Sequence, residues 1–169
     1  MPTSLRFIRL GDFLKYIIGI GTNIGDREKN ITEAINAFDL VPHTKVLRKS
    51  ALYETEPVGY ADQQNFYNAC FEIESDLEAN EILGVCLGIE AGFGRVREIK
   101  NGPRILDLDV ILAENEKIDT ANLTVPHPRY TERRFVLAPL MELFPDGNAY
   151  GIEFGGYLNN IEGQKIKRH

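Results

Sequence analysis

The chain has 169 residues, of which 43% are hydrophobic and 26% charged, a composition that predicts one globular domain with a buried core. Its net charge of -6 argues against nucleic acid and anionic membranes as partners, because an acidic surface does not attract a polyanion. It has no run of roughly 18 to 20 apolar residues and no leader with a small-residue cleavage site, so we expect a cytoplasmic protein without a membrane segment.

The cysteine content points to the same compartment. Cys70 and Cys86 form no C-x-x-C pair and are too few for a disulfide scaffold or a zinc site. We therefore predict that both are buried thiols that serve packing in a reducing environment.

Hydrophobic periodicity divides the chain into alternating strands and helices. Residues 16–22 read YIIGIGT, typical of a strand, and apolar side chains then recur at helical spacing up to Phe38. The run 66–75 alternates, which predicts a strand with Tyr67 and Phe71 on one face and Asn68 on the other. The expected elements are strands at 16–22, 45–55, 66–75 and 105–112, helices within 23–40 and 77–93, and a C-terminal helix interrupted by Pro139.

The order of these elements predicts the fold. Strand, helix, two strands, helix and strand form the split βαβ pattern, so we expect an α+β sandwich with a ferredoxin-like βαββαβ core, an antiparallel sheet and a C-terminal embellishment. Without repeats or linkers, the chain is expected to be a single domain over 1–169, with residues 1–15 as an N-terminal extension.

Two aspartates interrupt the buried strand at 105–112. Residues two apart in a strand share a face, so Asp107 and Asp109 project together while Leu106, Leu108, Val110 and Leu112 are expected to face the core. Two carboxylates on one strand face repel each other unless a cation neutralises them. Mg²⁺ suits the arrangement because it accepts one or two carboxylate ligands together with phosphate oxygens. The spacing alone leaves open a solvated strand face whose aspartates pair with nearby arginines.

A basic connector precedes the aspartates. It contains Arg95, Arg97 and Lys100 between Gly94 and Gly102, and Arg104 two residues after Gly102. Taken alone, this basic connector fits a solvated loop. Together, the aspartates as metal ligands and the connector's cations form the combination that phosphoryl-type transfer uses. The chain has no P-loop signature, and we interpret Gly19 and Gly21 as positions of close backbone packing.

The string KNGPRILDLDVIL at 100–112 resembles the signature of the 6-hydroxymethyl-7,8-dihydropterin pyrophosphokinase family (HPPK). YIIGIGTNIGD resembles that family's first strand and turn, ALYETEPVGYADQQNFYNA its pterin-side loop and strand, and LTVPHPRYTERRFVLAPLMEL its C-terminal segment. The resemblance covers about 16–145 and implies the ferredoxin-like fold. It also implies transfer of pyrophosphate from ATP to the pterin alcohol, with release of AMP, in folate biosynthesis.

The resemblance implies roles for residues on the nucleotide side. Asp107 and Asp109 would hold two Mg²⁺ ions, one across the α- and β-phosphates of ATP and the other across the β- and γ-phosphates. Arg95 and Arg104 would act on the phosphates in the transition state together with the aspartates. The implied ATP-binding residues are Arg97, Lys100, Arg104, His127 and Arg133.

On the pterin side, the resemblance implies a ring stacked between Phe66 and Phe135. Asn68 would bind the amide and amine edge of the pterin, and Thr55 and Val58 would supply further partners. Phe66 stands where many family members have tyrosine, and Asn101 stands where some have tryptophan, in a loop that is one residue shorter. Without the resemblance, the residues alone favour a place in the protein core for both phenylalanines and Asn68, because burial is the commoner fate of an isolated phenylalanine.

The implied partners are small molecules, ATP and 6-hydroxymethyl-7,8-dihydropterin, and the resemblance leaves open an association with neighbouring folate-pathway enzymes. Two other classes of function stay open from the residues alone: a non-catalytic ligand-binding module and an RNA-binding ferredoxin-like domain. The aspartate pair beside the arginines favours the enzyme over a sensor. The acidic charge and the missing aromatic-basic strand motif disfavour RNA binding.

Overall fold

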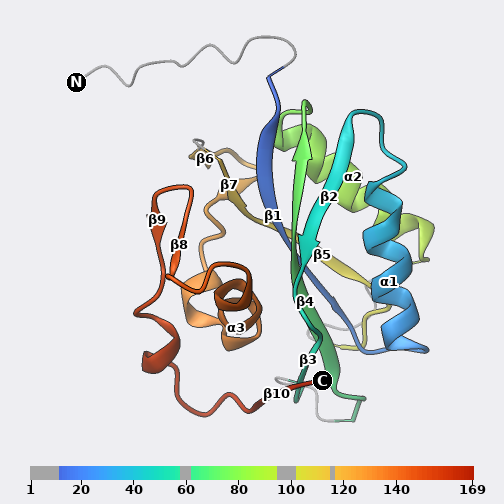
Figure 1. Ribbon diagram of the computed structural model, residues 1–169. Coiled ribbons are helices and arrows are strands. Elements are labelled where there is room, and N and C mark those ends of the chain that lie inside the picture. Colours follow the sequence, from blue (N-terminus) through green and yellow to red (C-terminus); the bar gives the residue numbers. More distant parts are fainter. Residues whose placement is uncertain (1–11, 58–61, 95–101, 115–116) are drawn as a thin grey trace.

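The computed structural model describes residues 12–57, 62–94, 102–114 and 117–169. Its centre is an antiparallel sheet with the strand order β10-β3-β4-β1-β5, in which β2 also pairs with β4 (Figure 1). The strands of this sheet are β1 (Leu14–Thr22), β2 (Thr44–Lys49), β3 (Tyr53–Thr55), β4 (Phe66–Ser75), β5 (Asp107–Ala113) and β10 (Ile166–Arg168).

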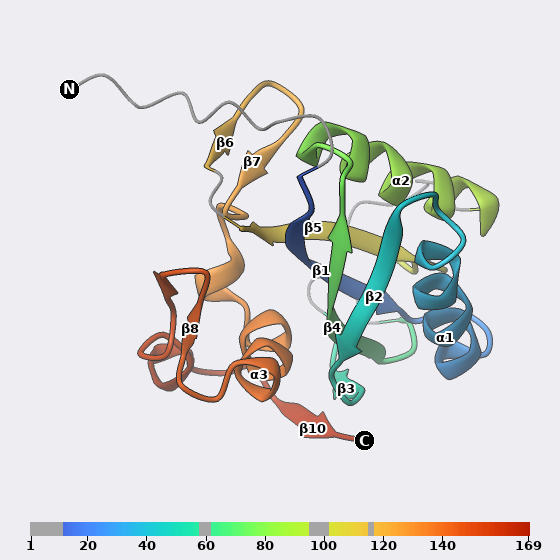
Figure 2. The same ribbon diagram turned by 45° about the horizontal axis from the view of Figure 1, so that its top comes forward.

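Helices cover both faces of the sheet, as Figures 1 and 2 show. On one face, α1 (Arg27–Phe38) and α2 (Ala79–Gly92) pack against the cluster around Tyr16, Phe71 and Ile82. On the other face, α3 (Arg134–Leu143) packs against a second cluster around Ile17, Ile111 and Leu112. The molecule is therefore a mixed α and antiparallel β fold with two cores, one on each side of the sheet.

Local sequence accounts for the beginning and the orientation of α1. The side chain of Asp26 accepts a hydrogen bond from the backbone N–H of Lys29 and caps the helix. Ile31, Ala34, Ile35 and Phe38 form its buried stripe, as their spacing predicted. The alternation in β4 is also confirmed, because Tyr67, Ala69, Phe71 and Ile73 share one core while Cys70 belongs to the other.

The predicted strand 45–55 is wrong as a single element, because it divides into β2 and β3. The division lies at Ser50. Its backbone N–H donates to the carbonyl of Cys70 at 2.8 Å, but its hydroxyl oxygen, in place of a carbonyl, accepts the N–H of Cys70 at 3.0 Å. The side chain thus takes over one hydrogen bond of the ladder, and the regular strand pattern stops there.

The predicted orientation of Leu112 is also wrong. Ile17 pairs with Leu112 and Ile18 with Val110, so the register of β1 and β5 shifts by one residue at a β-bulge. The bulge turns Leu112 to the α3 side, where it is buried with Ile111. Leu106, Leu108 and Val110 face the α1 and α2 side, as expected, although Leu106 precedes the strand.

Pro139 does not interrupt the last helix, contrary to expectation, since α3 is continuous across it. A proline inside a helix removes one backbone hydrogen bond, and the burial of Val136, Leu137, Leu140 and Leu143 against the sheet offsets that loss.

The remaining C-terminal elements are β6 (Ile118–Asp119), β7 (Thr124–Val125), β8 (Asn148–Ala149), β9 (Ile152–Glu153) and the 3₁₀ turns η1 (Tyr130–Glu132) and η2 (Leu158–Asn160). Across the described parts of the chain, none of the helices has the length and apolar character needed to cross a bilayer.

Candidate active site

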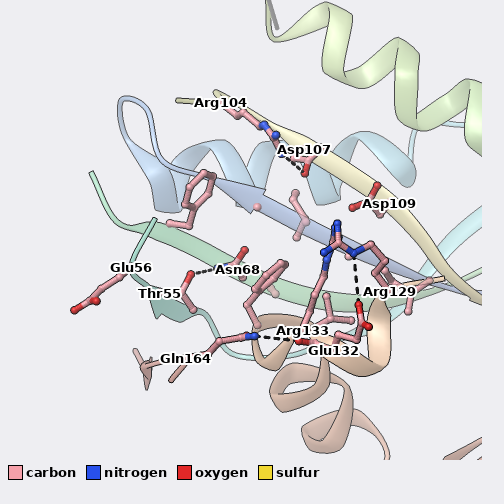
Figure 3. Close-up of a pocket in the computed structure, with 18 residues that line it drawn as sticks. Thr55, Glu56, Asn68, Arg104, Asp107, Asp109, Arg129, Glu132, Arg133 and Gln164 are labelled. Carbon is pink, nitrogen blue, oxygen red and sulfur yellow. Dashed lines mark hydrogen bonds and ion pairs between the residues drawn. The ribbon is translucent and has the colours of Figure 1, made fainter. Parts of the chain in front are cut away.

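A pocket of about 360 Å³ lies between the sheet and the beginning of α3. Figure 3 shows the side chains that line it, which come from β3, β4, β5 and the residues next to these strands, from the turn before α3 and from the C-terminal segment. We call the part around Arg104, Asp107 and Asp109 the carboxylate end. The part around Thr55, Phe66, Asn68 and Phe135 is called the amide end, and both sets line the pocket.

Two glycines of β1 form the floor between these ends. Gly21 lies opposite Asn68 of β4 and opposite Asp107 of β5, and Gly19 lies opposite Asp109. A Cβ atom on Gly21 would stand 2.9 Å from the Oδ1 of Asn68, and one on Gly19 would stand 3.2 Å from the Cδ1 of Ile111. The interpretation of Gly19 and Gly21 as close-packing positions is confirmed, because a Cβ atom at either position would crowd a neighbouring side chain, Ile111 or Asn68.

At the carboxylate end, alternation along β5 directs both aspartates to the pocket side of the sheet. The guanidinium of Arg104 donates to the Oδ2 of Asp107 at 3.2 Å. Both aspartates are partly exposed, so their oxygens are accessible from the pocket. Within the described ranges, the structure contains no cluster of three or more metal-ligating side chains, so a metal here would need ligands from a bound substrate or water.

A buried asparagine fixes the backbone beside Arg104. Asn23, 2% exposed, accepts the backbone N–H of Arg104 through its Oδ1 at 2.7 Å, and its own backbone N–H donates to the carbonyl of Arg104 at 3.0 Å. Its side-chain amide donates to the Oε1 of Gln63 at 2.8 Å and to the carbonyl of Gln64 at 3.0 Å. One side chain at the end of β1 thus joins the segment before β5 to the segment before β4.

At the amide end, strands β3 and β4 present a paired hydrogen-bonding edge. The Nδ2 of Asn68 donates to the Oγ1 of Thr55 at 2.8 Å, which orients the amide of this buried side chain. Phe66 and Phe135 line the same pocket from β4 and α3 and are half-buried, so their rings remain accessible to a ligand. A flat ring with donors and acceptors on one edge fits such a combination of aromatic faces and amide.

His127 lies beside the pocket, outside the residues that line it. Its backbone N–H donates to the carbonyl of Ile111 at 2.9 Å, and its Nδ1 accepts the N–H of Arg129 at 3.1 Å, which assigns the proton of the neutral ring to Nε2. Burial lowers the pKa of His127, and the Arg133 cation adds to that shift while Asp107 opposes it. His127 is therefore a neutral donor at pH 7.

The structure brings most of the sequence-predicted site residues into one pocket. Arg133 lines it, with its guanidinium carbon 5.6 Å from the ring centre of Phe135. His127 alone of the described candidates lies next to the pocket instead of lining it. Four candidates, Val58, Arg95, Arg97 and Lys100, lie outside the described residues.

Other side chains at the site were missed by sequence reasoning. Arg129 and Glu132 line the pocket and form an ion pair at 3.5 Å, and Gln164 reaches it from the C-terminal segment. Asn23 was missed although it sits in the quoted turn after the first strand. Its residue type could have indicated this role, because the side-chain amide of an asparagine directly after a buried strand can bind backbone groups of other segments. Nothing in the local sequence indicates Gln164.

Comparisons with known proteins show the family and the fold of this chain. The model of the 7,8-dihydro-6-hydroxymethylpterin-pyrophosphokinase family matches residues 17–145. The 2-amino-4-hydroxy-6-hydroxymethyldihydropteridine pyrophosphokinase of Bacillus subtilis is 46% identical over 126 residues, 75% of this chain and 75% of the relative. The protein of the same name in Methylorubrum extorquens is 42% identical over 129 residues, 76% of this chain and 82% of the relative. A crystal structure of Plasmodium falciparum HPPK-DHPS superimposes with a TM-score of 0.63 and 15% identity, covering 88% of this chain and 45% of that chain, which shows the shared fold.

Proposed function

Because this chain belongs to the 7,8-dihydro-6-hydroxymethylpterin-pyrophosphokinase family and is a pyrophosphokinase of folate biosynthesis, we propose that its reaction takes place in the pocket between the sheet and α3. The substrates are ATP and 6-hydroxymethyl-7,8-dihydropterin, and the products are AMP and the pterin diphosphate. One observation carries the assignment of the pocket: a carboxylate pair with an arginine at one end and an amide with two phenylalanines at the other open into the same space.

The amide end is the proposed pterin site. The pterin ring stacks between Phe66 and Phe135, and Asn68 binds its amide and amine edge with Thr55 beside it. The hydrogen bond that orients the amide of Asn68, at 2.8 Å from Thr55, supports this role because it fixes the edge before the ligand arrives. Val58, a further proposed pterin contact, lies outside the described residues.

The carboxylate end is the proposed site of two Mg²⁺ ions. The donor set fits this hard cation, because Asp107 and Asp109 offer carboxylate oxygens from one strand face and leave coordination positions for water and phosphate oxygens. Bound there, Mg²⁺ neutralises phosphate charge and draws electron density from the reacting phosphoryl group. The aspartates hold the ions, and the ion pair of Arg104 with Asp107 keeps its guanidinium at the same place.

In the proposed reaction, the hydroxymethyl oxygen of the pterin attacks the β-phosphorus of ATP. The bond from that phosphorus to the oxygen bridging to the α-phosphate breaks, AMP leaves with the bond electrons, and the hydroxyl proton passes to solvent. Arg104 stabilises the charge that develops on the phosphates, and Arg133 and His127 bind ATP, the histidine as a neutral Nε2–H donor. The proposed roles of Arg95, Arg97 and Lys100 on the phosphates fall on residues outside the described ranges.

The proposal also covers the ferredoxin-like core, the single-domain organisation, the location in the cell and a partner enzyme. The order β5-β1-β4 followed by β2 and β3 supports a ferredoxin-like βαββαβ core within a single domain. The two free, buried cysteines support a cytoplasmic location. The solved HPPK-DHPS structure supports an association of this chain with a neighbouring folate-pathway enzyme.

Product analysis tests the reaction. Wild-type protein incubated with MgATP and the pterin should form AMP and pterin diphosphate in equal amounts. Formation of ADP instead would mean attack at the γ-phosphorus and would overturn the proposed chemistry. Replacing Asn68 with Ala should raise the KM for the pterin far more than that for ATP, because Asn68 lies at the amide end.

A further inference from the structure

The C-terminal segment 161–169 lies outside the part of the chain that matches the family, residues 17–145, and yet it reaches the pocket through Gln164. We call this segment the C-terminal strap. Figures 1 and 2 show it passing below α3 and ending as β10 at the edge of the sheet. It therefore runs from the helix that forms one wall of the amide end to the strand that forms the other.

At its first end, the strap is joined to the beginning of α3 by hydrogen bonds from side chains to main-chain groups. The Oε1 of Gln164 accepts the backbone N–H of Arg134 at 2.9 Å, and its Nε2 donates to the carbonyl of Glu132 at 3.0 Å. In return, the guanidinium of Arg134 donates to the carbonyls of Gln164, at 3.0 Å, and of Ile161. The amide of Gln164 thus spans the backbone on both sides of Arg133 and directly before Phe135.

At its second end, the strap forms part of the sheet. Ile166 pairs with Thr55 in the antiparallel ladder of β10 and β3, and the backbone N–H of His169 donates to the carbonyl of Leu52 at 2.8 Å. Arg168 donates to Glu142 of α3 at 2.8 Å, which joins this end to the helix again. Thr55, the hydrogen-bond partner of Asn68, is therefore held by the strap from its other side.

We propose that the C-terminal strap sets the width of the amide end and that Gln164 is a positioning residue for Phe135. This inference rests on the proposed function, in which Phe135 stacks on the pterin. Both polar atoms of the Gln164 side chain are bonded to backbone groups, so its contribution passes through the residues it holds. Loss of these two hydrogen bonds lets the turn before α3 move away from β3, and the pterin ring then lies between walls that no longer fit it.

The test uses a substitution that keeps the volume of the side chain. Gln164→Met removes both hydrogen bonds while filling the same space, and Lys165→Met makes the same kind of change at the exposed neighbouring position. Gln164→Met should raise the KM for the pterin about tenfold, the size of effect expected from one to two lost hydrogen bonds. Lys165→Met should leave it unchanged.

Two further measurements separate positioning from general destabilisation. The Kd of a non-hydrolysable MgATP analogue should change less than threefold in Gln164→Met, because Arg133 is the one proposed nucleotide contact whose backbone Gln164 brackets, whereas Arg104 and the aspartates lie at the carboxylate end. In a double-mutant cycle, Gln164→Met should add little to the pterin KM of Phe135→Ala, because the residue it positions is already gone.

The outcomes distinguish this inference from the proposed function. Wild-type protein that forms no AMP with both substrates present would overturn the proposed function. An active wild type with an unchanged pterin KM in Gln164→Met would overturn the role of the strap alone. Equal rises in the pterin KM and the nucleotide Kd, or full additivity with Phe135→Ala, would also overturn it, because both indicate a structural effect that does not act through Phe135.

Discussion

Asn23 offers a sharp test of how the site is held together. Asn23→Ala removes three side-chain hydrogen bonds, from the N–H of Arg104 at 2.7 Å and to Gln63 and Gln64 at 2.8 and 3.0 Å. A typical net value of about 1 kcal/mol for each bond gives a sum of about 3 kcal/mol. Since Gln63 and Gln64 are partly exposed and can bind water instead, we expect the free energy of unfolding to fall by about 2 kcal/mol.

The same substitution should lower turnover. The backbone of Arg104 loses its bond to the Asn23 side chain, and the guanidinium then shifts relative to the phosphates that it is proposed to contact. A displacement of this kind costs on the order of 10- to 100-fold in kcat. Urea unfolding gives the stability change and steady-state AMP formation gives kcat. Asn36→Ala, at an exposed position of α1, is the matched control and should stay within about 0.5 kcal/mol of wild type.

One result would refute this reasoning. If Asn23→Ala is destabilised as predicted but keeps the kcat of wild type at saturating substrates, then the position of Arg104 does not depend on Asn23. A variant with unchanged stability would contradict the hydrogen-bond magnitudes instead.

The other predictions concern the floor of the pocket, a helix and one histidine. Gly21→Ala should raise the pterin KM at least about tenfold, because its Cβ would lie 2.9 Å from Asn68; an unchanged KM would show that the floor has room. Gly88→Ala has no atom within 4 Å of the new Cβ in α2 and should stabilise the fold by about 1 kcal/mol in urea unfolding. In metal-free protein, the lowered pKa of His127 means that the unfolded state binds more protons below about pH 6.5, so acidification favours unfolding. His127→Gln should therefore lose less stability than wild type between about pH 7 and pH 5.5; parallel pH profiles would contradict the lowered pKa.

The sequence predicted the elements whose patterns are local. The stripe of α1 and the alternation of β4 were readable because each depends on one segment. The division of a strand at Ser50, the bulge that turns Leu112 and the continuity of α3 across Pro139 were not, since each depends on what a neighbouring segment supplies. These three features depend on tertiary packing, and the hydrophobic pattern of a single segment carries no information about its neighbours.

The site divides in the same way. Asp107 and Asp109 were singled out because carboxylates in a buried strand are unusual, whereas Asn68 was assigned only through the family resemblance. Asn23 and Gln164 escaped because they act by binding the backbone of segments far away in sequence, 81 residues away for the bond from Asn23 to Arg104 and 32 for that from Gln164 to Glu132. Such residues hold the reactive groups in place without carrying a motif of their own.

The most direct test of the central claim is the rate of AMP formation from MgATP by wild type and by Asp107→Ala, with and without 6-hydroxymethyl-7,8-dihydropterin. Wild type should form AMP only when the pterin is present. Asp107→Ala should remain folded and lose at least about 100-fold of this rate, because a ligand of the proposed metal site is gone. Pterin-dependent AMP formation that continues unchanged in folded Asp107→Ala would contradict the role of the carboxylate pair.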